Sequence, residues 1–253
     1  SVRAGSYEDC KDCDLIIITA GRNRKTGETR LDLIAGNSAI LKNVVEQMKP
    51  HYTKGVIMIV SNPVDVLVYQ CTKWMGLPNG MVFGTGCVLD SSRFTRLIAD
   101  YTHLNTEVVK ATIVGEHGDA QIPIWSRVSI AGVPIQEYCE NVGLRWDENI
   151  RKDISDKVRE MGATIIKGKG KTHYGIATCV CYLAEAVLNQ RLTIAPVSTM
   201  FQGEYGIEDV CLSVPSIVGV NGVEKRLEEK WEEEEFQAFR RAAEKMKKVL
   251  KTL

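Results

Sequence analysis

His117 stands in the segment Val114-Gly-Glu-His-Gly-Asp119, directly after a stretch that is typical of a strand. Glycines on both sides let the backbone turn tightly and bring the imidazole to the edge of a cleft. Histidine changes its charge near neutral pH, so it can pass a proton to or from a reacting hydroxyl or carbonyl. A turn histidine without a chemical role explains the same pattern equally well, and this segment alone leaves both interpretations open.

An acid and two arginines could complete such a site. Asp90 and Arg93 are three residues apart, on one face of a helix start. Asp90 could hold one imidazole nitrogen and stabilise the cation, while Arg93 offers a planar fork that matches a carboxylate. Arg30 lies where a glycine-bearing loop meets a helix, and Asn62 follows a strand at the sheet edge where α/β proteins bind ligands. Each residue could be a surface ion pair or a turn residue, but their sum indicates an active site.

The elements that would position these residues alternate between strands and helices. Leu15–Thr19 and Gly55–Val60 are apolar runs rich in β-branched residues, typical of strands buried on both faces of a parallel sheet. Helical patterns follow at about 29–48 and 64–74, and a short strand at 81–83. This order predicts a doubly wound sheet.

The pattern changes after Asp90, where the alternation gives way to longer segments. We expect helices at about 91–101, 147–167, 174–190 and 227–253, and strand character at 108–114, 122–135 and 195–220. The predicted fold class is therefore α/β, with an incomplete Rossmann-type doubly wound parallel sheet and an α+β substrate domain. We place the dinucleotide-binding part at residues 1–87 and the catalytic part at residues 88–253.

Composition excludes several classes of function. The 253 residues carry 32 Lys+Arg and 32 Asp+Glu, and this balance argues against phosphate neutralisation on a nucleic acid. No apolar run reaches the roughly 18–20 residues of a membrane span, and the N-terminus has no signal-peptide pattern, so we expect a cytoplasmic protein. Of the eight cysteines only Cys10 and Cys13 form a C-x-x-C. We interpret that pair as free thiols in a loop, and we expect no metal site.

Taken together, the segments resemble the lactate/malate dehydrogenase family, specifically its lactate dehydrogenase-like branch. The matching segments follow the family order along nearly the whole chain: Ile17-Ile-Thr-Ala-Gly21, Gly27-Glu-Thr-Arg-Leu-Asp-Leu33, Val60-Ser-Asn-Pro-Val-Asp65, Gly84-Thr-Gly-Cys-Val-Leu-Asp-Ser-Ser-Arg-Phe94, Gly115-Glu-His-Gly-Asp119, Pro123-Ile-Trp-Ser126, Tyr174-Gly-Ile-Ala177 and Tyr205-Gly-Ile-Glu-Asp209.

The resemblance implies NAD-dependent oxidation of a 2-hydroxy acid, or reduction of the 2-oxo acid. By motif, His117 matches the family's general acid/base, Asp90 its orienting carboxylate and Arg93 its carboxylate clamp. Arg30 matches the loop arginine that polarises the carbonyl. Asn62 matches the residue that contacts both substrate and nicotinamide.

The same resemblance assigns the lining of the site and the partners of the chain. Thr172 matches a residue of the substrate pocket, Ile176 an apolar residue near the nicotinamide, and four residues match backbone against the cofactor: Thr19, Ala20, Gly21 and Val60. The implied partner is a small 2-hydroxy or 2-oxo acid, with no nucleic acid and no membrane. A homodimer or homotetramer is implied as well.

Arg24 bears on which acid is the substrate. Lactate enzymes of the family typically carry glutamine at this loop position, whereas malate enzymes carry arginine. Closing the loop over the methyl group of pyruvate would bury Arg24 unpaired, but a second carboxylate would pair with it. We therefore expect interconversion of (S)-malate and oxaloacetate, with L-lactate and pyruvate as the alternative. Arg22 and Thr26 depart from the residues usual in relatives and could change how the loop closes.

The chain departs from the family at its front. The family opens with a strand, a G-x-G-x-x-G turn and a helix, and the segment before Leu15 is too short for that unit. The sequence is interpreted as an incomplete record of a longer protein. The alternative is a truncated, non-catalytic interaction or structural form, in which strand 15–19 would leave a bare sheet edge that aggregates or finds a partner.

Overall fold

The computed structural model describes residues 1–23 and 30–253. Its first half is a parallel sheet flanked by helices. The strands and helices of this half are β1 (Leu15–Ile18), α1 (Arg30–Met48), β2 (Val56–Ile59), α2 (Val64–Met75) and β3 (Val82–Gly84). The three strands pair in parallel in the order β1-β2-β3. The predicted parallel start of the fold is confirmed, with bounds that differ by a residue or two.

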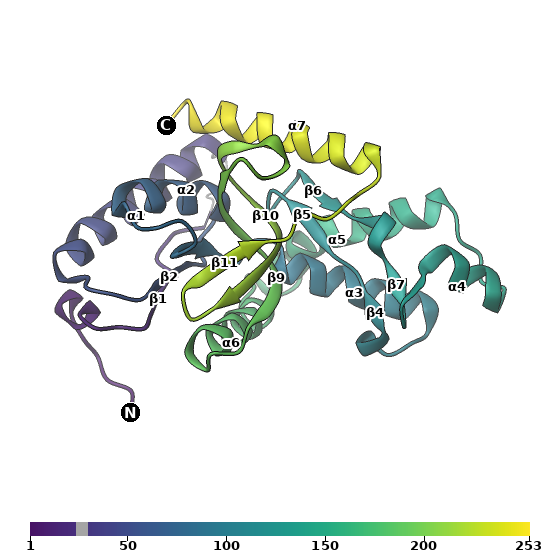
Figure 1. The fold of residues 1–253 in the computed structure, drawn as a ribbon, viewed down its shortest axis with the longest axis horizontal. Helices are drawn as coiled ribbons and strands as arrows, with labels where there is room; N and C mark the ends of the chain where they lie inside the picture. Colours follow the sequence, from purple (N-terminus) through teal and green to yellow (C-terminus); the bar gives the residue numbers. More distant parts are fainter. Residues whose placement is uncertain (24–29) are drawn as a thin grey trace.

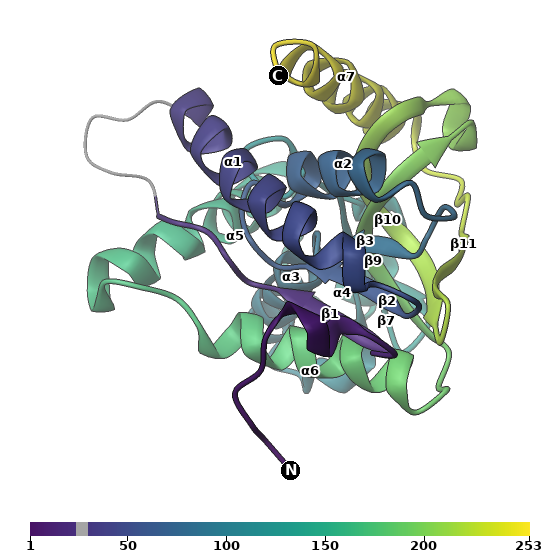
Figure 2. The ribbon, with the colours of Figure 1, turned by 90° about the vertical axis from the view of Figure 1, so that its left-hand side faces the viewer.

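The central strand β2 has its side chains covered on both faces. Ile57 and Ile59 pack in a cluster with residues of α1 and α2, whereas Val56 and Met58 pack on the other face with α6 (Tyr174–Leu188). The two sets alternate because successive side chains of a strand point to opposite faces. Figure 2 shows α1 and α2 side by side above the strands and α6 below them.

The expectation that the first strand is buried on both faces is wrong. Within β1 the side chain of Ile17 is 41% exposed, and only Ile18 is buried. The physical reason is position, because β1 ends the sheet and pairs with β2 alone among the described strands.

Beyond β3 the same sheet continues with antiparallel strands, in the order β3-β9-β10-β5-β6, and β11 also pairs with β10. These strands are β5 (Ile113–Gly115), β6 (Gln121–Pro123), β9 (Thr193–Gln202), β10 (Glu208–Gly219) and β11 (Gly222–Arg226). The sheet is therefore mixed rather than purely parallel. β11 was not predicted.

A row of small residues crosses four strands of this sheet. Gly84 of β3 pairs with Ser198 of β9, Ser198 with Ser213 of β10, and Ser213 with Gly115 of β5. Both serines are fully buried. Gly86, which follows β3, sits so close to this row that a Cβ there would lie 2.3 Å from Ser213 Oγ. Because the residues of the row are small, the chain after β3 can pass close to the sheet before α3 begins.

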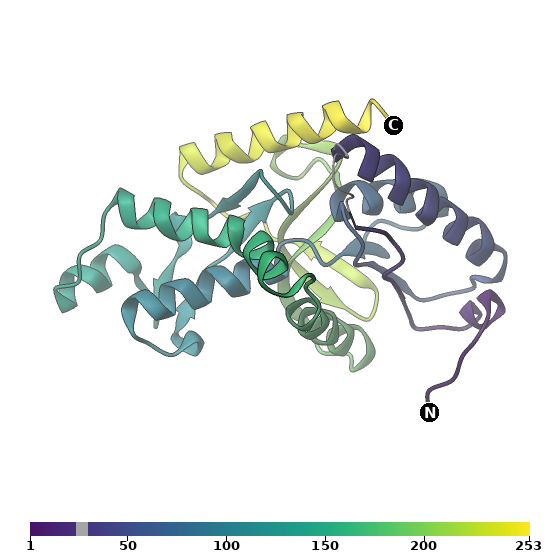
Figure 3. The same ribbon diagram turned by 180° about the vertical axis from the view of Figure 1, so that it is seen from behind.

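A helical layer and a small second sheet lie at one end of the molecule, as Figures 1 and 3 show. The sheet has the order β4-β7-β8. The elements of this end are α3 (Val88–Thr102), β4 (Val109–Lys110), β7 (Ser129–Ile130), β8 (Val133–Pro134), α4 (Ile135–Val142) and α5 (Glu148–Lys169). α4 is absent from the sequence prediction. Short 3-10 turns also occur at Tyr7–Cys10, Lys49–His51, Thr106–Val108, Trp125–Arg127 and Glu204–Gly206.

The last helix, α7 (Glu233–Leu250), runs along the top of Figure 1. Its predicted start near residue 227 is wrong, because Glu232 and Glu235 form a reciprocal capping box that begins the helix there. The segment before it is held in place instead by Trp231, which stacks on the ring of Tyr205.

The expectation for the cysteines agrees with the structure. Cys10 and Cys13 are free thiols in the segment before β1. Within residues 1–23 and 30–253, no group of three or more His, Cys, Asp or Glu side chains could hold a metal ion. In the same ranges no helix is long and apolar enough to cross a membrane.

The predicted division of the chain into two parts at residue 87/88 falls at the N-cap of α3 and stays a prediction.

Candidate active site

A cavity of about 450 Å³ opens at the carboxyl ends of the parallel strands. Thr19 and Gly21 follow β1, Val60 and Asn62 follow β2, and Thr85 follows β3. α/β sheets bind ligands at this edge, since loops there leave the strands in different directions. The opposite wall comes from α3, α5, α6 and the loop after β5. Its lining residues are Leu89, Asp90, Arg93, His117, Gly118, Gln121, Arg159, Gly162, Ile166, Thr172 and Ile176.

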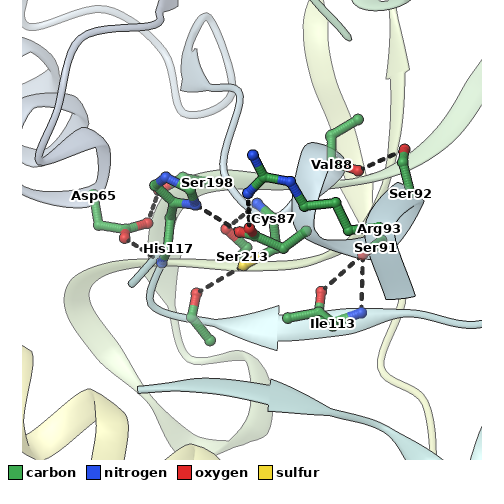
Figure 4. A network of polar contacts seen from close by, with 12 residues as sticks. Asp65, Cys87, Val88, Ser91, Ser92, Arg93, Ile113, His117, Ser198 and Ser213 are labelled. Carbon is green, nitrogen blue, oxygen red and sulfur yellow. Dashed lines mark hydrogen bonds and ion pairs between the residues drawn. The ribbon is translucent and has the colours of Figure 1, made fainter. Parts of the chain in front are cut away.

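The imidazole of His117 and the carboxylate of Asp90 meet in this cavity. His117 Nδ1 lies 2.6 Å from Asp90 Oδ2, and the guanidinium nitrogen Nη1 of Arg93 lies 3.4 Å from Asp90 Oδ1. Asp90 and Arg93 share one face of the first turns of α3, whereas His117 follows β5. Figure 4 shows the side chains of His117 and Arg93 near each other within this network of polar contacts. The Asp90 side chain is only 5% exposed, but that of His117 is 27% exposed, so the ring remains open to the cavity.

The surroundings of His117 act on its pKa in opposite directions. Burial lowers the pKa of the imidazole, because it disfavours the charged form. The carboxylate of Asp90 raises it by charge and hydrogen bonding, and that of Asp65 raises it by charge. The carboxylates prevail, and the pKa of His117 lies above its ordinary value of 6.5. A proton on this ring is therefore held more firmly than on a free imidazole.

Asp65 is a residue that the sequence reasoning missed. Its side chain is 2% exposed, and it accepts a hydrogen bond from the backbone N–H of His117 at 2.8 Å and from Ser198 Oγ at 2.6 Å. It lies in the first turn of α2, where the helix dipole favours a carboxylate. An acidic residue two positions after Asn-Pro, in the first turn of a helix that follows a strand, is the signal that could have found it.

Polar contacts fix the two loops that face His117 across the cavity. Asn37 of α1 is 1% exposed, and its side-chain amide donates to the carbonyl oxygen of Asn62 at 2.6 Å and accepts from the backbone N–H of Arg22 at 2.9 Å. Ser61 Oγ donates to the carbonyl oxygen of Ala20 at 2.6 Å. These bonds tie the loop after β1 to the loop after β2.

The predicted site residues fall into two groups. The structure brings His117, Asp90, Arg93, Asn62 and most of the predicted lining to one cavity, namely Thr19, Gly21, Val60, Thr172 and Ile176. Ala20 lies between two of these residues without lining the cavity. Arg24 lies outside the described residues. α1 begins at Arg30, but the side chain of that residue lies outside the described part as well.

Two family models match the chain in succession. Residues 1–84 match the NAD binding domain of lactate/malate dehydrogenases, and residues 87–253 match their alpha/beta C-terminal domain. The chain belongs to the lactate/malate dehydrogenase family. It is thus an oxidoreductase with NAD as its cofactor.

The curated relatives of this family member include several bacterial L-lactate dehydrogenases. The enzyme of Thermoanaerobacterium saccharolyticum is 42% identical over 100% of this chain and 81% of its own length. That of Acetivibrio thermocellus is 39% identical over 98% of this chain and 78% of its own length. Among solved structures, the minor L-lactate dehydrogenase of Enterococcus mundtii has a TM-score of 0.94 at 38% identity, covering 98% of this chain and 79% of that one.

The cavity suits the nicotinamide end of NAD. Gly21 brings the backbone close to the neighbouring loop, since a Cβ at Gly21 would lie 3.3 Å from Ser61 Cβ. Ile176 of α6 provides an apolar wall on the same cavity that His117 lines. A flat, partly apolar ring beside a proton-carrying imidazole is the arrangement that hydride transfer to a carbonyl needs.

Proposed function

We propose that this dehydrogenase reduces a short 2-oxo acid to the 2-hydroxy acid, and catalyses the reverse, with His117 as general acid/base. The observation that carries the proposal is the 2.6 Å contact between His117 Nδ1 and Asp90 Oδ2 inside the cavity. This contact occupies Nδ1 and orients the ring, which leaves Nε2 to exchange the proton.

The roles of the other residues follow from their charge and position. Bound NADH supplies the hydride that reduces the carbonyl carbon. His117 gives its Nε2 proton to the carbonyl oxygen as the alcohol forms, and Asp90 stabilises the imidazolium before that transfer. Arg93 holds the carboxylate of the substrate through paired hydrogen bonds. Asn62, Thr172 and, from the described start of α1, Arg30 complete the substrate contacts in this proposal.

L-lactate and pyruvate are the first candidate substrates. Several relatives that are 38–42% identical carry the name L-lactate dehydrogenase. (S)-malate and oxaloacetate are the second candidate, favoured by Arg24, whose guanidinium would be left unpaired by a methyl group and paired by a carboxylate.

Steady-state reduction assays with pyruvate and oxaloacetate, each with NADH and NADPH, test the function. Turnover of either acid with NADH supports the dehydrogenase, and the ratio of kcat/KM values chooses between the candidates. Arg24→Gln should move that ratio toward pyruvate if Arg24 selects the acid. Binding of NADH without turnover of any 2-oxo acid would instead support a non-catalytic role.

We also propose assembly as a homodimer or homotetramer, which the family resemblance supports. Light scattering at several concentrations tests this, and a monomer throughout would contradict it.

A further inference from the structure

One face of α5 borders the substrate cavity. Arg159, Gly162 and Ile166 recur at spacings of three and four residues, so they lie in one stripe along the helix. All three line the cavity that contains His117 and Arg93. Ile154 and Val158, which precede Gly162 on the same helix, belong to the apolar cluster beneath α5.

Gly162 is the point where α5 comes nearest to the carboxylate clamp. A Cβ at this glycine would lie 4.0 Å from Arg93 Nη1. Arg159 precedes Gly162 by three residues, which is about 4.5 Å along the helix axis. Arg93 and Arg159 therefore both line one cavity, and Gly162, which has no side chain, lies beside Arg93 and about one helical turn from Arg159.

The guanidinium groups of Arg93 and Arg159 have different ion-pair partners. The guanidinium of Arg93 shares the carboxylate of Asp90 with His117. Arg159 uses Nη1 to pair with Asp156 at 2.9 Å, and its side chain is 38% exposed. A guanidinium carries five N–H donors, so this one ion pair does not exhaust it. Asp156 in turn also pairs with Lys152.

We propose that Arg159 is a specificity-determining residue that binds the distal carboxylate of a dicarboxylic 2-oxo or 2-hydroxy acid, while Arg93 holds the carboxylate next to the reacting carbon. The inference rests on the proposed function, whose second candidate substrate it supports. It adds a binding point on α5 to that suggested by Arg24 in the loop, and it makes Arg159 a determinant of the ratio between oxaloacetate and pyruvate.

The test compares Arg159→Ala with wild type and with Lys157→Ala, using the full chain, NADH and both acids. Lys157 is a matched control because it is an exposed cation of the same helix, paired with Asp153, and it does not line the cavity. We expect Arg159→Ala to lower the kcat/KM ratio of oxaloacetate to pyruvate about tenfold, mostly through KM. Lys157→Ala should leave the ratio unchanged, and Arg159→Lys should restore part of it. An equal loss for both acids, or no change in the ratio, would overturn the proposal.

A binding measurement separates this inference from the proposed function. Isothermal titration calorimetry of wild type and Arg159→Ala with L-malate and with L-lactate measures the binding affinity and needs no turnover. The wild type should prefer malate and the variant should lose that preference, even if assays show that neither oxaloacetate nor pyruvate is reduced. Asp156→Asn should strengthen the preference, because it removes the carboxylate that competes for Arg159. An unchanged malate preference in Arg159→Ala contradicts the proposal, whatever the assays show.

Discussion

At the scale of single residues, His117 differs from the other histidines by its surroundings. Its ring contacts a buried carboxylate, its backbone N–H binds a second one, and its side chain borders the cavity. His103 by contrast is an exposed residue at the C-cap of α3, with a left-handed backbone conformation. Of these two histidines, only His117 is therefore expected to take part in catalysis.

Replacing His117 with asparagine should lower kcat/KM for the preferred 2-oxo acid by about 10²–10⁴-fold, because a positioned acid/base contributes that much. Since the side chain is partly exposed, the melting temperature should change little. His103→Asn is the control, because asparagine tolerates a left-handed conformation. Full activity in His117→Asn would exclude the proposed acid/base.

The pKa of His117 predicts a pH profile. Reduction needs the protonated imidazole, so kcat/KM should be level at low pH and fall as pH rises through the raised pKa. Asp90→Asn removes the larger of the two carboxylate effects that raise this pKa, and the fall should begin at lower pH. Oxidation needs the neutral ring and should show the opposite trend. Asp100→Asn, an exposed change on the same helix, should leave the profile in place.

At the scale of elements, Asp65 joins three parts of the chain. It stands on α2, binds Ser198 of β9, and binds the backbone beside the ring of His117. In these two contacts each carboxylate oxygen accepts one hydrogen bond, from the backbone N–H of His117 and from the hydroxyl of Ser198.

Asp65→Ala should therefore destabilise the fold by about 1–3 kcal/mol, because it leaves the buried N–H of His117 without this acceptor. The midpoint of urea unfolding measures this loss. Ser198→Ala is the comparison, because it removes one hydrogen bond and spares the contact with His117. It should cost less and leave kcat closer to wild type. If both variants unfold at the wild-type midpoint, the joining role is wrong.

Local patterns predicted the parallel half of the sheet well, because buried β-branched runs such as β2 are distinctive. The exposed edge of β1 could not be read from the same pattern, since a run of isoleucines looks alike at the centre and at the edge of a sheet. The order β3-β9-β10-β5 depends on pairing between distant segments, which local periodicity does not contain. α4 was missed because only eight residues carry its pattern.

At the scale of the site, motifs predicted which residues gather in the cavity. They placed Asp90, Arg93 and His117 together, although the chain brings them from α3 and from the loop after β5. They did not indicate Asp65 or Arg159, whose positions depend on how α2 and α5 pack in three dimensions.

At the scale of the whole molecule, an aromatic cluster packs α7 against the rest of the fold. Phe239 is fully buried, and its ring lies 5.9 Å from Phe201, 5.5 Å from Tyr205 and 5.2 Å from Trp231 between ring centroids. The cluster also includes Ile34 of α1, so it connects the C-terminal helix to the first half of the chain.

Phe239→Ala should lower the free energy of unfolding by about 3–5 kcal/mol, because it empties a packed aromatic site. Phe236→Ala removes a partly buried ring of the same helix and should cost less. Thermal unfolding followed by circular dichroism measures both. An equal and small loss in the two variants would show that the cluster does not hold α7.

The row Gly84–Ser198–Ser213–Gly115 limits how this protein can vary. Each of these positions lies between close neighbours, and a methyl group at Gly84 would meet Val64 Cγ2 at 2.5 Å. A combinatorial library randomised at these four sites should yield folded clones almost exclusively with the original glycines at position 84 and at position 115, where φ is +91°. Positions 198 and 213 should accept only glycine, serine or alanine. Directed evolution toward new acid substrates should therefore change residues of the cavity wall and keep the residues of this row.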